Sequence, residues 1–272
     1  MNADSAFRVG STHEVCQDYA AAGACGACGP YAVLADGCSS SPDTDVGARL
    51  LVKAAERLLR ESGGPPASLL NELHAETARL ALSWTGLLGL RPQAVDATLL
   101  TAHINGGELV VGCSGDGVVC LQTTEGALDV YVVSYPQGYP VYPAYAHQPA
   151  RLRALADAGL VSKEVTYLRA DSAEEPLRPV RVSEGGTLTE VIAVSAVGYR
   201  FATLLSDGLH SFLRLGTTES IPAESVVPEL VSFKNTRGAF VGRRMQGFLK
   251  DCRQKGWRHA DDLSLAALHL GG

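Results

Sequence analysis

Three Asp-Gly pairs end apolar runs in this sequence of 272 residues: Asp36-Gly37, Asp116-Gly117 and Asp207-Gly208. A hairpin turn is the ordinary explanation for one such pair, because Asp-Gly is a favoured turn dipeptide. We favour that explanation for Asp116 taken alone. It fits Asp36 and Asp207 less well, since a Cys-Ser-Ser-Ser-Pro segment and a helical pattern follow the first, and Gly-Leu-His-Ser-Phe follows the second. These two carboxylates call for another explanation.

Further aspartates stand in or beside predicted strands, where acidic residues have low β propensity. Asp18 lies inside an early strand, and the pair Asp261-Asp262 opens the last one. Hard divalent cations would explain such positions, because Mg²⁺ and Mn²⁺ prefer carboxylate and water oxygens. None of the seven histidines has a zinc-type spacing, and the sequence contains no G-x-S-x-G motif and no Gly-rich phosphate loop. The pattern favours a polycarboxylate metal site.

The cysteines indicate a reducing environment. Their number, seven, is odd, and they are spread along a chain far longer than a disulfide-stapled small domain. Cys25 and Cys28 form a C-x-x-C motif, but a zinc knuckle would need a second pair, and a redox motif would be expected to open a helix. We interpret this motif as part of a loop between two strands.

The composition favours one large globular domain spanning residues 1–272, because 46% of the residues are hydrophobic. A net charge of −6 gives no electrostatic basis for binding nucleic acid or an anionic membrane. The sequence has no signal-peptide pattern at its start and no stretch of about 18 apolar residues. We therefore expect a cytoplasmic protein, and a monomer.

Helical periodicity occurs in two blocks of the chain. The first predicts a helix from about Pro42 to Arg60, capped by Ser41, and a second helix over about 67–82. The later block predicts helices within 223–233 and 238–252. Each pair should pack on a sheet, the two pairs on opposite sides of the molecule.

Nine short β-type runs, bounded by Gly, Asn and Asp, surround these helices. Residues 105–107 (Asn-Gly-Gly) supply a tight hairpin between the runs 97–104 and 108–114, so these strands should be antiparallel. Antiparallel strands interspersed with helix pairs indicate an α+β layered sandwich.

Six short segments carry a resemblance to a known family. In sequence order they resemble the signature blocks of metal-dependent protein phosphatases of the 2C type, the PPM family, in its bacterial branch. The segments span nearly the whole chain: GSTHEVCQD (10–18), YAVLADGCSSS (31–41), DATLL (96–100), GCSGDG (112–117), LLSDGLHSF (204–212) and DDLSL (261–265).

The resemblance implies a four-layer α-β-β-α sandwich of two stacked antiparallel sheets, with two Mn²⁺ or Mg²⁺ ions in a cleft between the sheet edges. Asp36 would bridge both ions, with the Gly37 carbonyl on one of them. Asp207 and Asp261 would hold the other ion. Asp18 would bind directly or through water, and Asp116 would bind a third, weaker ion. Asp262 would orient the neighbouring ligand, unless Asp262 rather than Asp261 is itself the ligand.

The implied activity is hydrolysis of phosphoserine or phosphothreonine, in which a water shared by the two ions attacks phosphorus in line. Asp36, Asp18 and His13 are the candidate catalytic residues. His13 replaces an Arg that clamps phosphate in many eukaryotic relatives, and it could donate to phosphate or be an ordinary His at a strand edge. Cys38 replaces a His proposed as general acid in relatives, so water could take that part.

The partner implied is a phosphorylated protein, the substrate of a bacterial serine/threonine kinase. The Tyr/Pro-rich segment 131–149 is either a substrate flap or a surface loop that packs its own tyrosines. Three alternatives stay open. The first is a catalytically weak relative that binds phosphoproteins, the second a phosphatase of small metabolites, and the third a calcium binder, which would lack an EF-hand loop.

Overall fold

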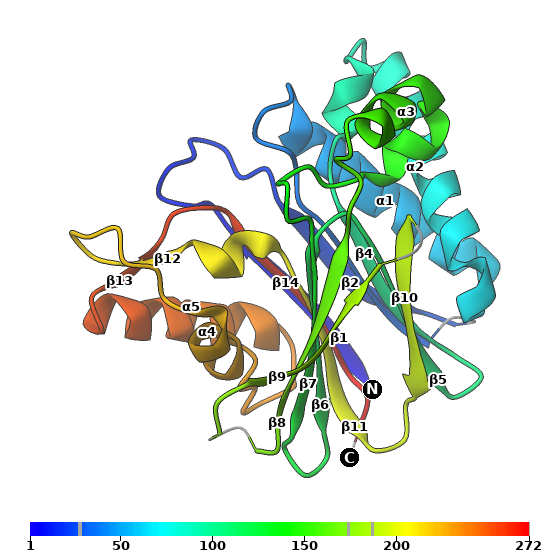
Figure 1. Ribbon diagram of the computed structural model, residues 1–272. Coiled ribbons are helices and arrows are strands. Elements are labelled where there is room, and N and C mark those ends of the chain that lie inside the picture. The colour runs from blue at the N-terminus through cyan, green and yellow to red at the C-terminus, as the bar shows by residue number, and fades with distance from the viewer. Residues whose placement is uncertain (27–28, 173–174, 186–187, 272) are drawn as a thin grey trace.

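The computed structural model describes residues 1–26, 29–172, 175–185 and 188–271. Two antiparallel sheets lie against each other, and helices cover the outer face of each (Figure 1). This is the predicted α-β-β-α sandwich. No helix in the described ranges is long and apolar enough to cross a membrane.

The larger sheet has seven strands in the order β1-β14-β11-β6-β7-β8-β9. Its central strands carry apolar side chains on both faces, as expected for strands buried between a helix layer and a second sheet. Their bounds are Asn2–Arg8 (β1), Gly117–Thr123 (β6), Leu128–Ser134 (β7), Glu164–Ala170 (β8), Arg178–Glu184 (β9), Tyr199–Leu205 (β11) and Leu263–His269 (β14). Its outer helices are α4 (Ala223–Leu230) and α5 (Phe240–Gln254).

The second sheet has five strands in the order β10-β5-β4-β3-β2. The strands are Tyr19–Cys25 (β2), Gly29–Ala35 (β3), Leu99–Asn105 (β4), Glu108–Ser114 (β5) and Thr189–Ser195 (β10). The helices α1 (Thr44–Ser62) and α2 (Leu70–Leu87) cover it, with α3 (Pro149–Asp157) nearby. A third apolar layer fills the space between the two sheets. A two-stranded ribbon of Phe212–Arg214 (β12) and Trp257–His259 (β13) completes the strands of the described part.

The nine predicted strands are all present, and Asn105 pairs with Glu108 across the predicted hairpin. Two local predictions are wrong. Ser41 does not cap α1, since the cap position is Asp43 and the Ser41 hydroxyl donates to Asp96 instead, at 2.8 Å. The turn at Asp116 is not a hairpin, because it carries the chain from β5 in one sheet to β6 in the other.

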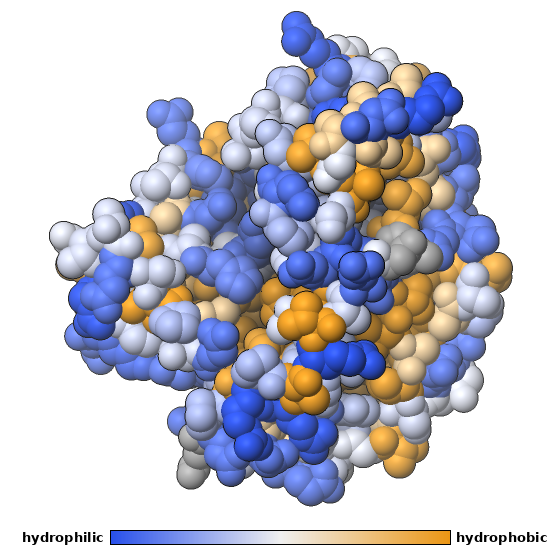
Figure 2. Space-filling view, viewed as in Figure 1, coloured by the Kyte–Doolittle hydropathy of each residue, from blue (hydrophilic) through white to orange (hydrophobic). Residues whose placement is uncertain are grey.

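Each sheet has two edge strands, β1 and β9 in the larger sheet and β2 and β10 in the smaller one. On the face shown in Figure 2, apolar residues gather over β10, whose Val191, Ile192 and Val194 are half-buried. Strand β9 exposes Val180 but also contains Pro179. Proline and charged residues on an edge discourage pairing with a strand of another molecule.

His74 of α2 is buried against the five-stranded sheet. Its Nδ1 lies 2.7 Å from the Ser114 hydroxyl and its Nε2 lies 2.8 Å from that of Thr101. Burial, with a smaller contribution from His103, lowers the pKa of His74 from 6.5 to about 3. The folded protein therefore contains the neutral ring, whereas the unfolded chain takes up a proton below about pH 6.5. His74 therefore stabilises the fold above about pH 6.5, and this stabilisation is lost as the pH falls towards 3.

We expect His74→Gln to reveal this linkage, because an amide can bond to both hydroxyls but does not titrate. At about pH 7 the wild type should be more stable by about 1 kcal/mol, owing to the better fit of the ring. That difference in the free energy of unfolding, measured in urea, should shrink and then reverse as the pH falls to about 4. A difference that does not depend on pH would contradict this account.

Candidate metal centre

Four of the predicted aspartates line one cavity of about 320 Å³ at the end of the two sheets: Asp36, Asp116, Asp207 and Asp261. Gly37 lines it too. The pairing of the strands explains this arrangement. Leu205 of β11 pairs with Val118 of β6 and with Leu265 of β14, so the residues beyond Leu205 lie beside the start of both neighbours.

Asp18 approaches the same place from β2, because Tyr19 pairs with Ala35 and thereby sets Asp18 beside Asp36. Its side chain is 1% exposed, and within the described ranges neither carboxylate oxygen has a hydrogen-bond partner. Burial raises the pKa of Asp18 to about 7, although the nearby hydroxyls of Ser206 and Ser264 lower it. A buried carboxylate without partners is costly unless a cation compensates it.

The carboxyl groups in this cavity repel one another when ionised. Burial, followed by the charges of Asp18 and Asp207, raises the pKa of Asp36 well above its ordinary value. Burial and the charge of Asp207 raise the pKa of Asp116 to about 7. The pKa of Asp261 is also raised, mainly by burial.

The residues present fit a centre of hard divalent cations. The donors around the cavity include four carboxylates and the backbone of Gly37 beside hydroxyl groups and one thiol, and the oxygen ligands among them suit Mg²⁺ and Mn²⁺. The unpartnered oxygens of Asp18 are the strongest sign, since the described protein atoms give them no hydrogen bond.

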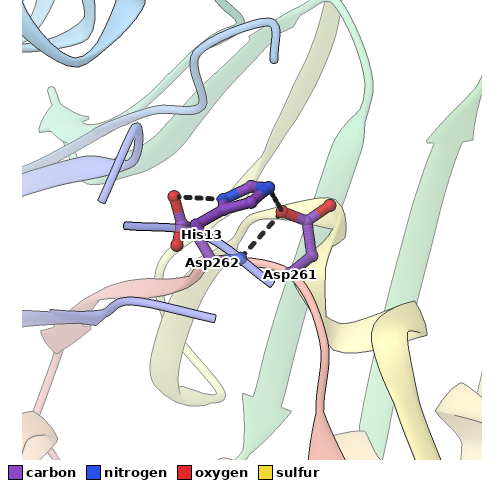
Figure 3. Close-up of side chains that lie close together, drawn as sticks. All are labelled: His13, Asp261 and Asp262. Carbon is purple, nitrogen blue, oxygen red and sulfur yellow. Dashed lines mark hydrogen bonds and ion pairs between the residues drawn. The ribbon is translucent and has the colours of Figure 1, made fainter. Parts of the chain in front are cut away.

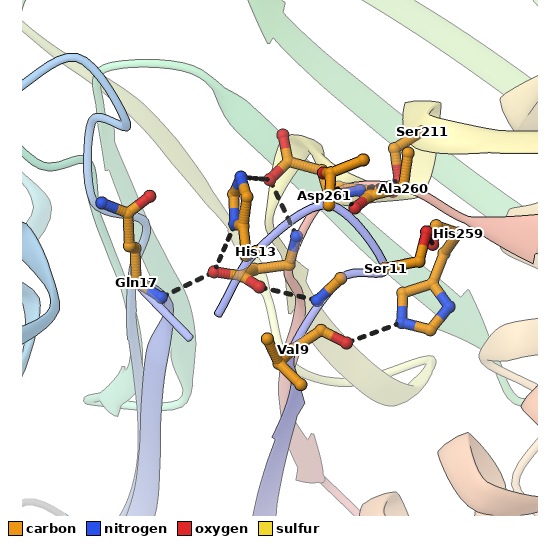
Figure 4. Close-up of polar contacts among 12 residues, drawn as sticks. Val9, Ser11, His13, Gln17, Ser211, His259, Ala260 and Asp261 are labelled. Atoms are coloured by element: carbon orange, nitrogen blue, oxygen red, sulfur yellow. Dashed lines mark hydrogen bonds and ion pairs between the residues drawn. The ribbon is translucent and has the colours of Figure 1, made fainter. Parts of the chain in front are cut away.

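Asp261 and Asp262 have different surroundings. Asp261 lines the cavity, whereas Asp262 is 2% exposed and accepts the backbone N–H of Gly10 at 2.7 Å and of Gln17 at 2.6 Å (Figure 4). Asp262 thus ties the last strand to the segment before Asp18. Asp261 is thus placed to face the cavity, whereas Asp262 bonds to the backbone, and the choice of Asp261 over Asp262 as a metal ligand stays a prediction.

His13 lies between these two aspartates (Figure 3). Its Nδ1 is 3.0 Å from Asp262 and its Nε2 is 3.5 Å from Asp261. The close contact with Asp262 raises the pKa of His13, although partial burial opposes the rise. Both ring nitrogens therefore face carboxylates, and His13 is placed to position Asp261 and Asp262. Anchoring of phosphate by His13 stays a prediction.

Two glycines allow the segments of the site to approach closely. A Cβ at Gly208 would lie 1.7 Å from the carbonyl oxygen of Asp262, and a Cβ at Gly37 would lie 2.9 Å from that of Gln17. The Asp-Gly pairs at 36 and 207 are thus explained by close backbone packing and not by hairpin turns.

The rim of the cavity contains Cys38 and one tyrosine that the sequence did not single out. Tyr142, from the Tyr/Pro-rich segment, lines the cavity together with Cys38. Burial opposes ionisation of the Cys38 thiol, but hydrogen bonds with Ser40 and Tyr142 bring its pKa below the usual value. Tyr142 also packs edge-to-face on Tyr145, with ring centroids 5.5 Å apart. The segment therefore packs its own tyrosines and also forms one wall of the cavity.

A partly buried ion pair holds this wall in place. Arg151 of α3 donates to both oxygens of Asp96 at 2.7 Å, and the backbone carbonyl of Asp96 accepts the N–H of Cys38 at 2.8 Å. Asp96 opens the DATLL segment, but nothing in the sequence indicates its partner 55 residues away. Cys28 of the C-x-x-C motif and the side chain of Cys25 lie outside the described residues.

Comparisons with known proteins agree with this geometry. A family model described as protein phosphatase 2C matches residues 10–223. The serine/threonine phosphatase Stp1 from Staphylococcus aureus has a TM-score of 0.60 at 12% identity, over 100% of this chain and 96% of that one. The serine/threonine phosphatase PstP/Ppp from Mycobacterium tuberculosis has a TM-score of 0.57 at 15% identity, over 100% of both chains. At these identities the likeness concerns the fold. No curated protein matches the chain significantly in sequence.

We expect Asp36→Asn to raise the melting temperature in the presence of a chelator, because it removes one of several repelling buried charges. Manganese should raise the melting temperature of the wild type by several degrees, since a ligand at about 100 times its Kd adds about 2.7 kcal/mol. The melting temperature of Asp36→Asn should rise much less when manganese is added. Differential scanning calorimetry tests this, with Asp157→Asn on the surface of α3 as control. An equal gain in wild type and Asp36→Asn would contradict a metal site at Asp36.

Proposed function

The chain belongs to the protein phosphatase 2C family, and on that basis we propose that it is a metal-dependent serine/threonine protein phosphatase whose catalytic centre is the aspartate cavity. One observation carries the proposal: four separate segments bring Asp36, Asp116, Asp207 and Asp261 to one cavity, beside the buried and unpartnered Asp18. Neither packing nor the stability of the fold explains why several carboxylates of like charge lie together in one cavity.

Each residue has a proposed part in holding two Mn²⁺ or Mg²⁺ ions. The charges of both Asp18 and Asp207 act on Asp36, and Asp36 would be the carboxylate that serves both ions. The Gly37 carbonyl would complete the coordination of one ion. Asp207 and Asp261 would hold the other ion. Asp116, whose pKa responds mainly to burial and to Asp207, would take a third and weaker ion.

When bound, such ions lower the pKa of a water molecule and offset the charge of the phosphoryl oxygens. The protein's own residues supply positioning. Asp262 fixes the backbone of Gly10 and Gln17, and His13 holds both Asp261 and Asp262. The wall of Tyr142 and Cys38 limits the cavity on the side of the Tyr/Pro-rich segment.

The proposed substrate is a protein phosphorylated by a bacterial serine/threonine kinase, and the proposed compartment is the cytoplasm, since the five described cysteines are free thiols. A second candidate is a catalytically weak member that binds phosphoproteins. It is favoured by Cys38, which stands where relatives have a proposed acid, and by the engagement of both His13 nitrogens.

Phosphate release from p-nitrophenyl phosphate and from a phosphothreonine peptide, with manganese or with chelator, distinguishes the two candidates. We expect turnover that needs metal, and a loss of at least about 100-fold in Asp36→Ala and Asp207→Ala, because each removes a ligand. Asp157→Ala is the matched control for loss of an exposed aspartate. A folded wild type that binds manganese but releases no phosphate from either substrate would leave the binding protein as the better account.

A further inference from the structure

A second and larger cavity, of about 810 Å³, lies between the end of β1 and helix α5 and has the opposite charge. Its lining includes Arg8, Arg243, Lys250, Arg253 and His259. We call it the basic groove. No acidic residue lines it, although the whole chain has a net charge of −6.

The Arg and Lys side chains of the groove are not paired with acidic residues of the described part of the chain. Arg243, Lys250 and Arg253 are exposed on one face of α5, at helical spacing, while the opposite face buries Phe248 and Cys252 in the core. In the described part of the chain no ion pair involves these three residues or Arg8, and Arg243 donates only to a backbone carbonyl. Unpaired like charges around one cavity repel each other, so an anion would be bound favourably there.

The basic groove and the aspartate cavity are lined by neighbouring residues of one segment, and Figure 4 shows two of them, His259 and Asp261. Val9 and His259 line the groove, and the ring of His259 contacts the carbonyl oxygen of Val9 at 3.2 Å. Two residues beyond His259, Asp261 lines the aspartate cavity. Because two residues of chain span at most about 7 Å, one extended peptide a few residues long can reach both.

From these contacts, and resting on the phosphatase function proposed above, we propose that the basic groove binds an acidic segment of the phosphoprotein substrate, flanking the phosphorylated residue. Carboxylates of that segment pair with Arg8, Lys250 and Arg253. Val9, which is 45% exposed, and Leu249 offer apolar contact to a peptide. Nucleic acid is a poorer match, because the lining has no Trp, Tyr or Phe on which bases could stack.

Binding can be tested without catalysis. A fluorescent, unphosphorylated peptide rich in Asp and Glu is titrated with the full-length protein in chelator, and its anisotropy is measured. We expect saturable binding that weakens with salt, because the contacts are exposed ion pairs. In Lys250→Glu/Arg253→Glu the Kd should rise at least about tenfold.

The matched control is Arg57→Glu/Arg79→Glu, which changes the net charge equally but lies on α1 and α2, in the opposite outer layer. It should bind the peptide nearly as the wild type does. Thermal melting checks that both double variants are folded. Absence of binding by the wild type, equal loss in both double variants, or stronger competition from a single-stranded oligonucleotide would each overturn the proposal.

Measurements of turnover test the proposed role of the basic groove separately from the proposed phosphatase function. With manganese, phosphothreonine peptides with acidic residues on one side or the other are compared with a neutral peptide. We expect kcat/KM to favour at least one acidic peptide about tenfold, and this preference should disappear in Lys250→Glu/Arg253→Glu while hydrolysis of p-nitrophenyl phosphate is unchanged. If the wild type is active but does not prefer an acidic peptide, the proposed role of the basic groove is overturned. If the wild type is inactive but still binds the acidic peptide at the groove, only the proposed phosphatase function is overturned.

Discussion

Mutual repulsion among buried carboxylates is the constraint on which the candidate site depends. Two like charges about 4 Å apart at an effective dielectric constant near 20 repel by about 4 kcal/mol, and Asp36 faces several neighbours of the same sign. Such a cluster persists only where the backbone holds it. A cation bound there would remove the repulsion, so metal binding and folding would stabilise each other.

The backbone is held by the two sheets. Each aspartate stands just outside a strand whose neighbours are paired, so the position of the carboxylate follows from the register of the sheet. Asp262 adds a link that no strand pairing supplies, because its two oxygens bond the segment from Gly10 to Gln17 to the last strand. His13 then contacts both members of the Asp261-Asp262 pair. The polar network thus aligns the first and last segments of the chain.

Much of this could be predicted from the sequence, because local patterns of apolar residues and Asp-Gly pairs report on strands and their ends. All nine predicted strands exist, and four predicted aspartates share a cavity. The strands that were not predicted are β1, β8, β9, β12 and β13. Of these, β9 is mostly exposed, β1 contains Asn2 and Asp4, and β12 and β13 have three residues each. The cap at Ser41 failed for a tertiary reason, since Asp96 and Arg151 are distant in sequence. Asp116 looked like a hairpin because no local signal shows that the chain changes sheets there.

The separation of the two cavities has an electrostatic reason. An Arg or Lys within contact of Asp207 or Asp261 would form an ion pair and occupy the oxygens that a cation needs. The groove's positive charges instead line a separate cavity, and no described Arg or Lys lines the aspartate cavity. From the groove they can attract an acidic substrate without forming ion pairs with the aspartates. An acidic chain with an acidic centre can thereby bind an anionic partner next to that centre.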